Sequence, residues 1–165
     1  VTSYSLIANL PYDVSSSVIA NAILHEIPVE SLTFTVQLEV AQRILASAGS
    51  KDYGPLSILA QSVGSARLIR TLPQKAFWPR PKVQSAFVRI EIDQTKRTDP
   101  NLHAFHQFIR LLFIHRRKNL RGSIIAIPDF KPLKSILPEL LQEIGFNRDN
   151  RAESLDPQSL RTLHQ

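Results

Sequence analysis

The distribution of local patterns along the chain is the feature that most constrains its fold. Residues 1–95 contain short segments with apolar side chains at every second position, separated by segments with helical spacing, whereas residues 96–165 contain helical spacing alone. The clearest strand pattern is that of Leu32, Phe34 and Val36, which alternate with polar side chains. Strands mixed with helices, followed by helices only, predict an α/β domain and then a small all-α domain, with a boundary at about residue 96.

Four strands and three helices are expected before that boundary. The strands cover residues 3–8, 32–38, 66–71 and 84–92, and the helices cover 15–27, 39–47 and 56–63. No helix separates the last two strands, because a proline-rich loop connects them. We therefore expect the second half of an α/β sheet that ends in an antiparallel pair. After the boundary, the strongest helix presents on one face Leu102, Phe105, Ile109, Leu112 and Phe113.

Composition excludes several kinds of site. Cysteine is absent, which removes disulfides, thiolate zinc sites, iron–sulfur clusters and cysteine nucleophiles, and favours a reducing compartment such as the cytoplasm. The five glycines match neither the G-x-G-x-x-G pattern nor a P-loop. No apolar run approaches the roughly 18 residues of a membrane span, so no membrane partner is expected. Methionine is also absent, and the chain opens directly in an apolar segment, so we expect an internal fragment.

The charge favours an acidic partner. The formal net charge is +6 and the pI is near 10.0. Residues 96–165 hold 12 Lys/Arg against 7 Asp/Glu, whereas residues 1–95 hold 8 against 7. Most of the excess therefore belongs to the helical part, which we expect to contact nucleic acid.

The tetrapeptide Asn9-Leu10-Pro11-Tyr12, at the end of a predicted strand, is the most informative motif. The exocyclic amine of adenine is a poor nucleophile, and two acceptors that bind its N–H groups help to localise its lone pair. The Asn9 side-chain carbonyl and the Leu10 backbone carbonyl are candidates for these acceptors, Pro11 fixes the turn, and Tyr12 is suited to stack on an extruded base. The alternative interpretation is an ordinary Asn-x-Pro turn.

The loop Phe77-Trp78-Pro79-Arg80-Pro81 is a second candidate element of a base pocket. Phe77 could supply the wall opposite Tyr12, and Lys82 could contact phosphate. The same residues would also suit a hydrophobic plug over the end of the sheet, followed by a solvated lysine.

A basic run in the helical part is a candidate phosphate-binding surface. It contains Arg116, Arg117 and Lys118, flanked by Arg110 and Arg121, and no carboxylate lies between residues 99 and 129. If one helix continued through the run, three of the arginines would lie within about 20° of one another. The alternative is a solvated helix face. The pair His103-x-x-His106 lacks further ligands, so no metal site is expected.

Taken together, these motifs resemble the ribosomal RNA adenine dimethyltransferases of the small-subunit KsgA type. The matching segments, in order, are N-L-P-Y at 9–12, V-Q-L-E-V-A-Q-R-I at 36–44, S-K-D-Y-G at 50–54, F-W-P-R-P-K-V-Q-S at 77–85 and R-R-K-N-L-R at 116–121. The resemblance covers nearly the whole chain. It implies a Rossmann-like methyltransferase domain, of which residues 1–95 are the C-terminal, target-base half, followed by a helical rRNA-binding domain at 96–165.

The resemblance also implies a chemistry. Asn9 and Leu10 would hold the target amine, Tyr12 and Phe77 would sandwich the adenine, and S-adenosylmethionine would donate the methyl group, with Asn9 as the donor-site residue present here. The implied partner is small-subunit rRNA in the immature small ribosomal subunit, and the full-length enzyme is expected to be a monomer. The family's glycine-rich donor motif precedes N-L-P-Y, so we expect this chain alone to be inactive. The alternatives are an rRNA-binding assembly factor without catalysis and a DNA adenine methyltransferase.

Overall fold

The computed structural model describes residues 3–147 and 149–165 and contains a mixed four-stranded sheet. Its strands are β1 (Tyr4–Asn9), β2 (Val29–Gln37), β3 (Gly64–Leu72) and β4 (Ser85–Ile92), in the spatial order β1-β2-β4-β3. Strands β1 and β2 are parallel, whereas β4 is antiparallel to both β2 and β3. The predicted antiparallel pair is therefore confirmed.

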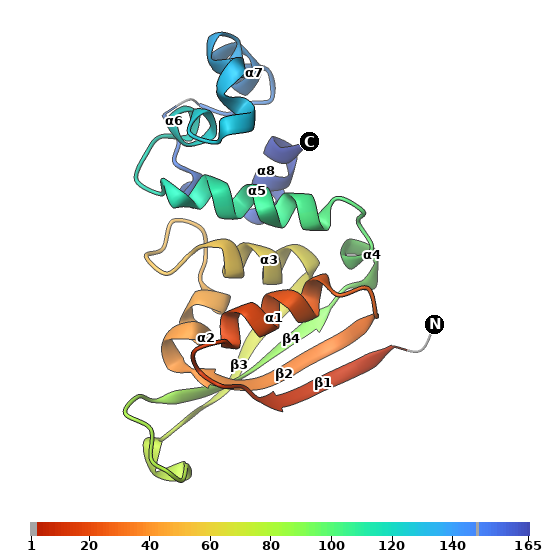
Figure 1. Cartoon of the computed structure of the whole chain (residues 1–165), viewed down its shortest axis with the longest axis vertical. Coiled ribbons are helices and arrows are strands. Elements are labelled where there is room, and N and C mark those ends of the chain that lie inside the picture. The colour runs from red at the N-terminus through yellow and green to blue at the C-terminus, as the bar shows by residue number, and fades with distance from the viewer. Residues whose placement is uncertain (1–2, 148) are drawn as a thin grey trace.

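Three helices cover one face of this sheet (Figure 1). They are α1 (Ser15–Leu24), α2 (Leu38–Leu45) and α3 (Pro55–Val63). Leu32, Phe34 and Val36 of β2 are fully buried in the core against these helices, as their spacing predicts, and Thr33 between the first two is buried as well. The sheet thus buries its apolar side under the helices and keeps a more polar side opposite.

Helix α1 ends three residues before the predicted boundary. The guanidinium group of Arg97 donates hydrogen bonds to the carbonyls of Ile23, His25 and Ile27, at 3.2 Å for Ile23 and 2.9 Å for Ile27. These bonds satisfy carbonyl groups at and beyond the helix end, and the chain turns into an extended conformation at His25. Ile27, expected on the buried stripe, is 52% exposed as a result.

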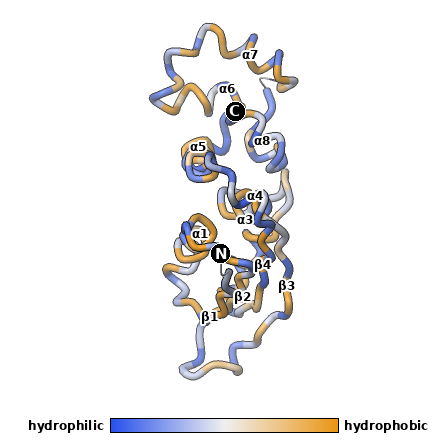
Figure 2. The backbone as a smooth tube through the Cα atoms, turned by 90° about the vertical axis from the view of Figure 1, so that its right-hand side faces the viewer, coloured by the Kyte–Doolittle hydropathy of each residue, from blue (hydrophilic) through white to orange (hydrophobic). Residues whose placement is uncertain are grey.

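The second half of the chain is helical, as predicted. Its α-helices are α4 (Gln94–Arg97), α5 (Leu102–Ile114), α6 (Leu120–Ile125), α7 (Leu137–Glu143) and α8 (Pro157–His164). Short 3₁₀ segments occur at η1 (Gln74–Ala76), η2 (Pro128–Ser135) and η3 (Ala152–Ser154). Figure 2 shows the resulting layers, with the sheet at one end, α1 and α3 above it, then α5 and α8, and finally α6 and α7.

One continuous helix through the basic run was the condition for a shared arginine stripe, and the structure does not meet it. Helix α5 ends at Ile114, and α6 begins only at Leu120. The Asn119 side chain accepts a hydrogen bond from the Gly122 backbone N–H at 2.8 Å and so caps a new helix. Arg110, Arg117 and Arg121 therefore do not share one helical stripe.

The two halves share one hydrophobic core. The Tyr53 hydroxyl, in the loop before α3, donates a hydrogen bond to the Leu155 carbonyl at 2.9 Å, and the Tyr53 ring packs edge-on against Phe113 at 6.3 Å. Burial, with a contribution from the Asp156 charge, strongly raises the pKa of this hydroxyl. A domain boundary at residue 96 stays a prediction, but the segments on either side of it are packed together.

Candidate functional site

The Asn9-Leu10-Pro11-Tyr12 segment leaves the sheet at the carboxyl end of β1. Asn9 is the last residue of the strand and lies opposite Thr35 of β2. The Leu10 backbone N–H donates to the Thr35 carbonyl at 3.3 Å, and the Leu10 side chain is buried. Asn9 and Pro11 are exposed on either side of this anchor. Ligands of open α/β sheets bind at this edge, where the carboxyl ends of parallel strands meet.

Two hydrogen bonds fix Tyr12, one at its side-chain hydroxyl and one at its backbone carbonyl. Its hydroxyl lies 2.5 Å from the hydroxyl oxygen of Ser85, and its backbone carbonyl accepts a hydrogen bond from the Ser15 hydroxyl at 3.1 Å. Ser85 is the first residue of β4 and is fully buried. This contact joins two sequence motifs that lie 73 residues apart.

Two carbonyl acceptors are available at the same place. Among the described residues, no hydrogen bond engages the Asn9 side chain or the Leu10 carbonyl. The arrangement can therefore accept N–H groups from a ligand beside the Tyr12 ring. The exocyclic amine of adenine would offer such N–H groups, and its binding by Asn9 and Leu10 stays a prediction.

The loop between β3 and β4 projects from this end of the sheet (Figure 1). Phe77 is half-buried, and its backbone N–H donates to the Gln74 carbonyl at 3.3 Å. Within the part of the chain that the structure describes, no aromatic contact links Phe77 with Tyr12. The sandwich of an adenine between these two rings therefore stays a prediction. Lys82 is exposed on the same loop.

The basic run is divided between structural and exposed side chains. Arg116 forms an ion pair with Glu153 and donates to the Ser50 carbonyl at 3.0 Å, so it joins the segment after α5 to η3 and to the loop before α3. Arg121 is half-buried, donates to the Lys134 carbonyl at 3.5 Å and keeps a buried Nε without a partner within the described residues.

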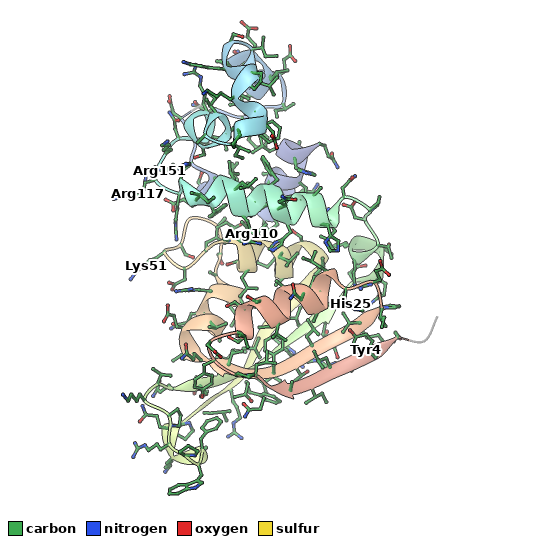
Figure 3. The ribbon with its side chains drawn as sticks, in the orientation of Figure 1. Tyr4, His25, Lys51, Arg110, Arg117 and Arg151 are labelled. Carbon is green, nitrogen blue, oxygen red and sulfur yellow. The ribbon has the colours of Figure 1, made fainter. Side chains whose placement is uncertain are left out.

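Arg110, Arg117 and Lys118 are exposed. Figure 3 shows Arg117 at the end of α5 beside Arg151, with Lys51 on the loop below. The bonds from Arg116 to Glu153 and to Ser50 hold these segments together. The exposed cations Arg117, Arg151 and Lys51 therefore lie around the carboxyl end of α5, whereas Arg110 lies further back on the same helix.

The two histidines of α5 have different surroundings. The Nε2 atom of His103 lies 2.7 Å from the Leu24 carbonyl, whereas the Nδ1 atom of His106 is buried and has no hydrogen-bond partner among the described residues. Burial, followed by the charges of Arg110 and His103, lowers the pKa of His106. No cluster of three metal-ligating side chains occurs in residues 3–147 and 149–165, and no helix there could cross a membrane.

Comparison with known proteins identifies the family. The sequence profile described as "Ribosomal RNA adenine dimethylase" matches residues 2–138. The chain belongs to this family.

Relatives and solved structures agree with this assignment. Ribosomal RNA small subunit methyltransferase A of Geobacillus thermodenitrificans is 34% identical over 94% of this chain and 54% of its own length, and that of Alkaliphilus oremlandii is 36% identical over 91% and 52%. A dimethyladenosine transferase from Plasmodium falciparum superposes with a TM-score of 0.86 at 22% identity, over 96% of this chain and 64% of that one. The 23S rRNA methyltransferase ErmE gives 0.64 at 19%, over 98% and 64%.

These comparisons confirm the Rossmann-like methyltransferase fold and the resemblance described from the sequence. The chain spans about half the length of the curated relatives that it matches. As methyltransferases, the members of this family imply S-adenosylmethionine as the methyl donor.

Two cavities among the described residues can be compared with the Asn9 segment as candidates for the donor site. One cavity of about 520 Å³ lies among α3, α4 and α8, and another of about 480 Å³ lies beside α7. Neither cavity is lined by Asn9 or Tyr12. The two glycines with positive φ, Gly49 and Gly145, also lie away from the Asn9 segment in the chain. A role of Asn9 toward the donor stays a prediction.

Sequence reasoning missed Ser85 as a site residue and Arg97 as a structural one. Ser85 is the last residue of the F-W-P-R-P-K-V-Q-S segment, but only the folded sheet brings its hydroxyl to Tyr12. Arg97 looks like a solvated cation in the sequence, yet it is buried against three carbonyls. A small polar residue that starts an otherwise apolar strand was the available signal for Ser85.

Proposed function

We propose that this chain is the target-base and RNA-binding part of an S-adenosylmethionine-dependent adenine-N6,N6-dimethyltransferase that acts on small-subunit rRNA. The observation that supports the proposal most is the hydrogen bond between Tyr12 and Ser85. It holds the N-L-P-Y segment against the base of the loop that carries Phe77. A pocket for one extruded base needs both segments at one place.

The residues act on the amine by accepting its hydrogens. The Asn9 amide oxygen and the Leu10 carbonyl each accept one N–H of the adenine amine, which localises the nitrogen lone pair for attack on a methyl group. Acceptors that are fixed before the reaction cost no reorganisation while charge develops on the amine. Tyr12 supplies a rigid stacking surface, because Ser85 restrains its hydroxyl. Phe77 covers the other face of the base.

The proposed partner is the small-subunit rRNA of an immature ribosomal subunit. The curated relatives at 34% and 36% identity carry small-subunit names, which supports this choice over large-subunit rRNA. The exposed cations Arg110, Arg117, Lys118 and Lys82 would contact phosphates, with smaller contributions from the engaged Arg116 and Arg121. We further propose a cytoplasmic protein that acts as a monomer in its complete form.

The test uses the longest natural polypeptide that contains this sequence. Its transfer of labelled methyl groups to unmethylated small subunits is measured for the parent, for Asn9→Ala and for Asn101→Ala. Asn101 is exposed, and its side chain forms no cap hydrogen bond to helix α5, so it is the matched control. Loss of one polarising hydrogen bond costs about 2.7–4 kcal/mol, or a factor of about 10²–10³ in rate.

We expect Asn9→Ala to lose methyl transfer while the control keeps it. Turnover of Asn9→Ala near the parent value would contradict the assignment of Asn9. If the parent binds rRNA tightly but transfers no methyl group, the protein is instead a non-catalytic assembly factor.

A further inference from the structure

The hairpin of β3, β4 and their connecting loop, residues 64–92, carries a concentration of unmatched positive charge. No Asp or Glu occurs between residues 53 and 90. In contrast, six of the eight Lys/Arg residues of the first 95 lie there, namely Arg67, Arg70, Lys75, Arg80, Lys82 and Arg89. Among the described residues, only Arg89 of these six pairs with a carboxylate, that of Glu91 at 3.1 Å. We call this segment the basic hairpin.

The strand register places three of these cations, Arg67, Arg70 and Arg89, on the sheet face that the helices leave uncovered. The register of β3 shifts between Leu68 and Arg70, so that Arg67 lies opposite Arg89 and Arg70 lies opposite Phe87. These residues of β4 alternate with its buried side chains and therefore point away from the core. Like charges directly opposite on neighbouring strands repel each other. A bound polyanion would offset that repulsion.

The tip of the basic hairpin carries a solvent-exposed aromatic side chain. Trp78 is 97% exposed, so almost none of its large apolar surface is buried in the fold. The loop around it is cross-linked by side chains: the Gln74 amide donates to the Lys82 carbonyl at 2.7 Å, and Arg80 donates to the Gln74 side-chain oxygen at 3.1 Å. The loop thus presents the ring from a braced framework.

We propose that the basic hairpin binds single-stranded RNA next to the target adenine, with Trp78 stacked on an unpaired base and Arg70, Arg80 and Lys82 on phosphates. The inference rests on the proposed function for the identity of the strand. Cations interleaved with a stacking ring are how proteins hold single strands without reading their sequence. The hairpin loop also ends at Ser85, which contacts Tyr12, so the strand would run continuously into the base site.

Trp78 is the only tryptophan of the chain, so intrinsic fluorescence reports on it alone. The 165-residue chain is titrated with an oligouridylate of about 12 nucleotides, a length within the site sizes of single-strand binders. We expect saturable quenching of the emission. With a fluorescein-labelled oligonucleotide and anisotropy detection, Trp78→Ala should weaken binding about 5- to 150-fold, as expected for one lost stacking contact, and Trp78→Phe should recover part of it.

The phosphate contacts are tested by charge. The double substitution Arg80→Gln and Lys82→Gln should lower the slope of log affinity against log salt by about 1.4, at about 0.7 per phosphate contact on a single strand. The matched control is Lys131→Gln with Lys134→Gln, which removes the same charge from exposed positions of η2. The control pair should leave the slope unchanged.

Three results would overturn the inference. The first is unchanged affinity of Trp78→Ala, and the second is equal salt slopes for the two double variants. The third is a change in Trp78 emission, either quenching or a blue shift, that RNA does not cause. If the change appears with rising protein concentration, another copy of the chain covers Trp78. If it appears with anionic vesicles of phosphatidylglycerol and phosphatidylcholine, a lipid surface covers it. If the longest natural polypeptide transfers methyl groups and Trp78→Ala leaves its KM for rRNA unchanged, the hairpin inference fails while the proposed function stands.

Discussion

The hydrogen bond between Tyr12 and Ser85 allows a quantitative test of how the base site is held. Tyr12→Phe removes only the hydroxyl and leaves the Ser85 hydroxyl, which is fully buried, without its partner. An unsatisfied buried hydroxyl costs about 1–3 kcal/mol. Ser85→Ala leaves the half-exposed Tyr12 free to reach water, so its expected cost is nearer the net value of one hydrogen bond, about 0.5–1.5 kcal/mol.

The two substitutions should therefore be non-additive. Once either hydroxyl is gone, removal of the other adds little, so we expect an interaction energy of about 1 kcal/mol in the double-mutant cycle. The free energies of unfolding are measured by urea titration with far-UV circular dichroism, because Trp78 is already exposed and its fluorescence would report poorly on unfolding. Tyr4→Phe, on the half-buried Tyr4 of β1, is the control and should change stability by less than about 0.5 kcal/mol.

The same variants distinguish base stacking by the Tyr12 ring from the hydrogen bond that its hydroxyl forms with Ser85. In the longest natural polypeptide, Tyr12→Phe keeps a stacking surface and should lose less methyl transfer than Tyr12→Ala, which also loses about 1–3 kcal/mol of base stacking. If the free energies of Tyr12→Phe and Ser85→Ala add to within about 0.3–0.5 kcal/mol, the two hydroxyls are not coupled and the reasoning is refuted.

Three further predictions concern binding and pH. Arg117→Gln with Lys118→Gln should lower the slope of log rRNA affinity against log salt by about 1.4 without loss of stability. Arg116→Gln should destabilise the fold because it breaks the ion pair with Glu153. Equal stability of the two variants in urea would contradict this division. The 165-residue chain should show no saturable binding of S-adenosylmethionine by calorimetry while it still binds RNA, and tight donor binding would show that the described residues suffice. Burial lowers the pKa of His106 and His164, so the folded state favours their neutral forms. The resulting contribution to stability is fully present above the pKa of an unfolded histidine, near 6.5. It is lost as the pH falls through that value toward the lowered pKa of the folded state. His106→Gln with His164→Gln should flatten this loss in thermal melts between about pH 7 and 5, and an unchanged slope would exclude these two groups as its source.

The strands and the helices of the first half could be predicted because their signals are local. Alternation at Leu32, Phe34 and Val36 and the proline-rich loop after β3 depend only on neighbouring residues, and both are present in the structure. The order of the strands required a long-range pairing of β2 with β4, which no local pattern encodes. For the same reason the contact between Tyr12 and Ser85 could not be predicted, although each residue lies in a motif that the sequence displayed.

The basic run shows where local reasoning fails. The sequence left open whether one helix continues through this run, and the short Asn119 side chain acts as a cap and starts a new helix. Charge alone also could not separate Arg116 and Arg97, which bind carboxylate or carbonyl groups of the fold, from Arg117 and Lys118, which stay exposed. Formal charge in the second half therefore overstates the surface available to RNA.

The bond from Tyr53 to Leu155 also has a consequence for folding on the ribosome. The two residues lie 102 positions apart, and Gly49 contacts the neighbouring Glu153 carbonyl at 2.6 Å. At a synthesis rate of about 5–20 residues per second, Leu155 emerges about 5–20 s after Tyr53. During that interval the ring of Tyr53 and the apolar surface around it are not yet covered by the segment that contains Leu155. A nascent chain of this protein should therefore engage chaperones that bind exposed hydrophobic segments until η3 and α8 have been made.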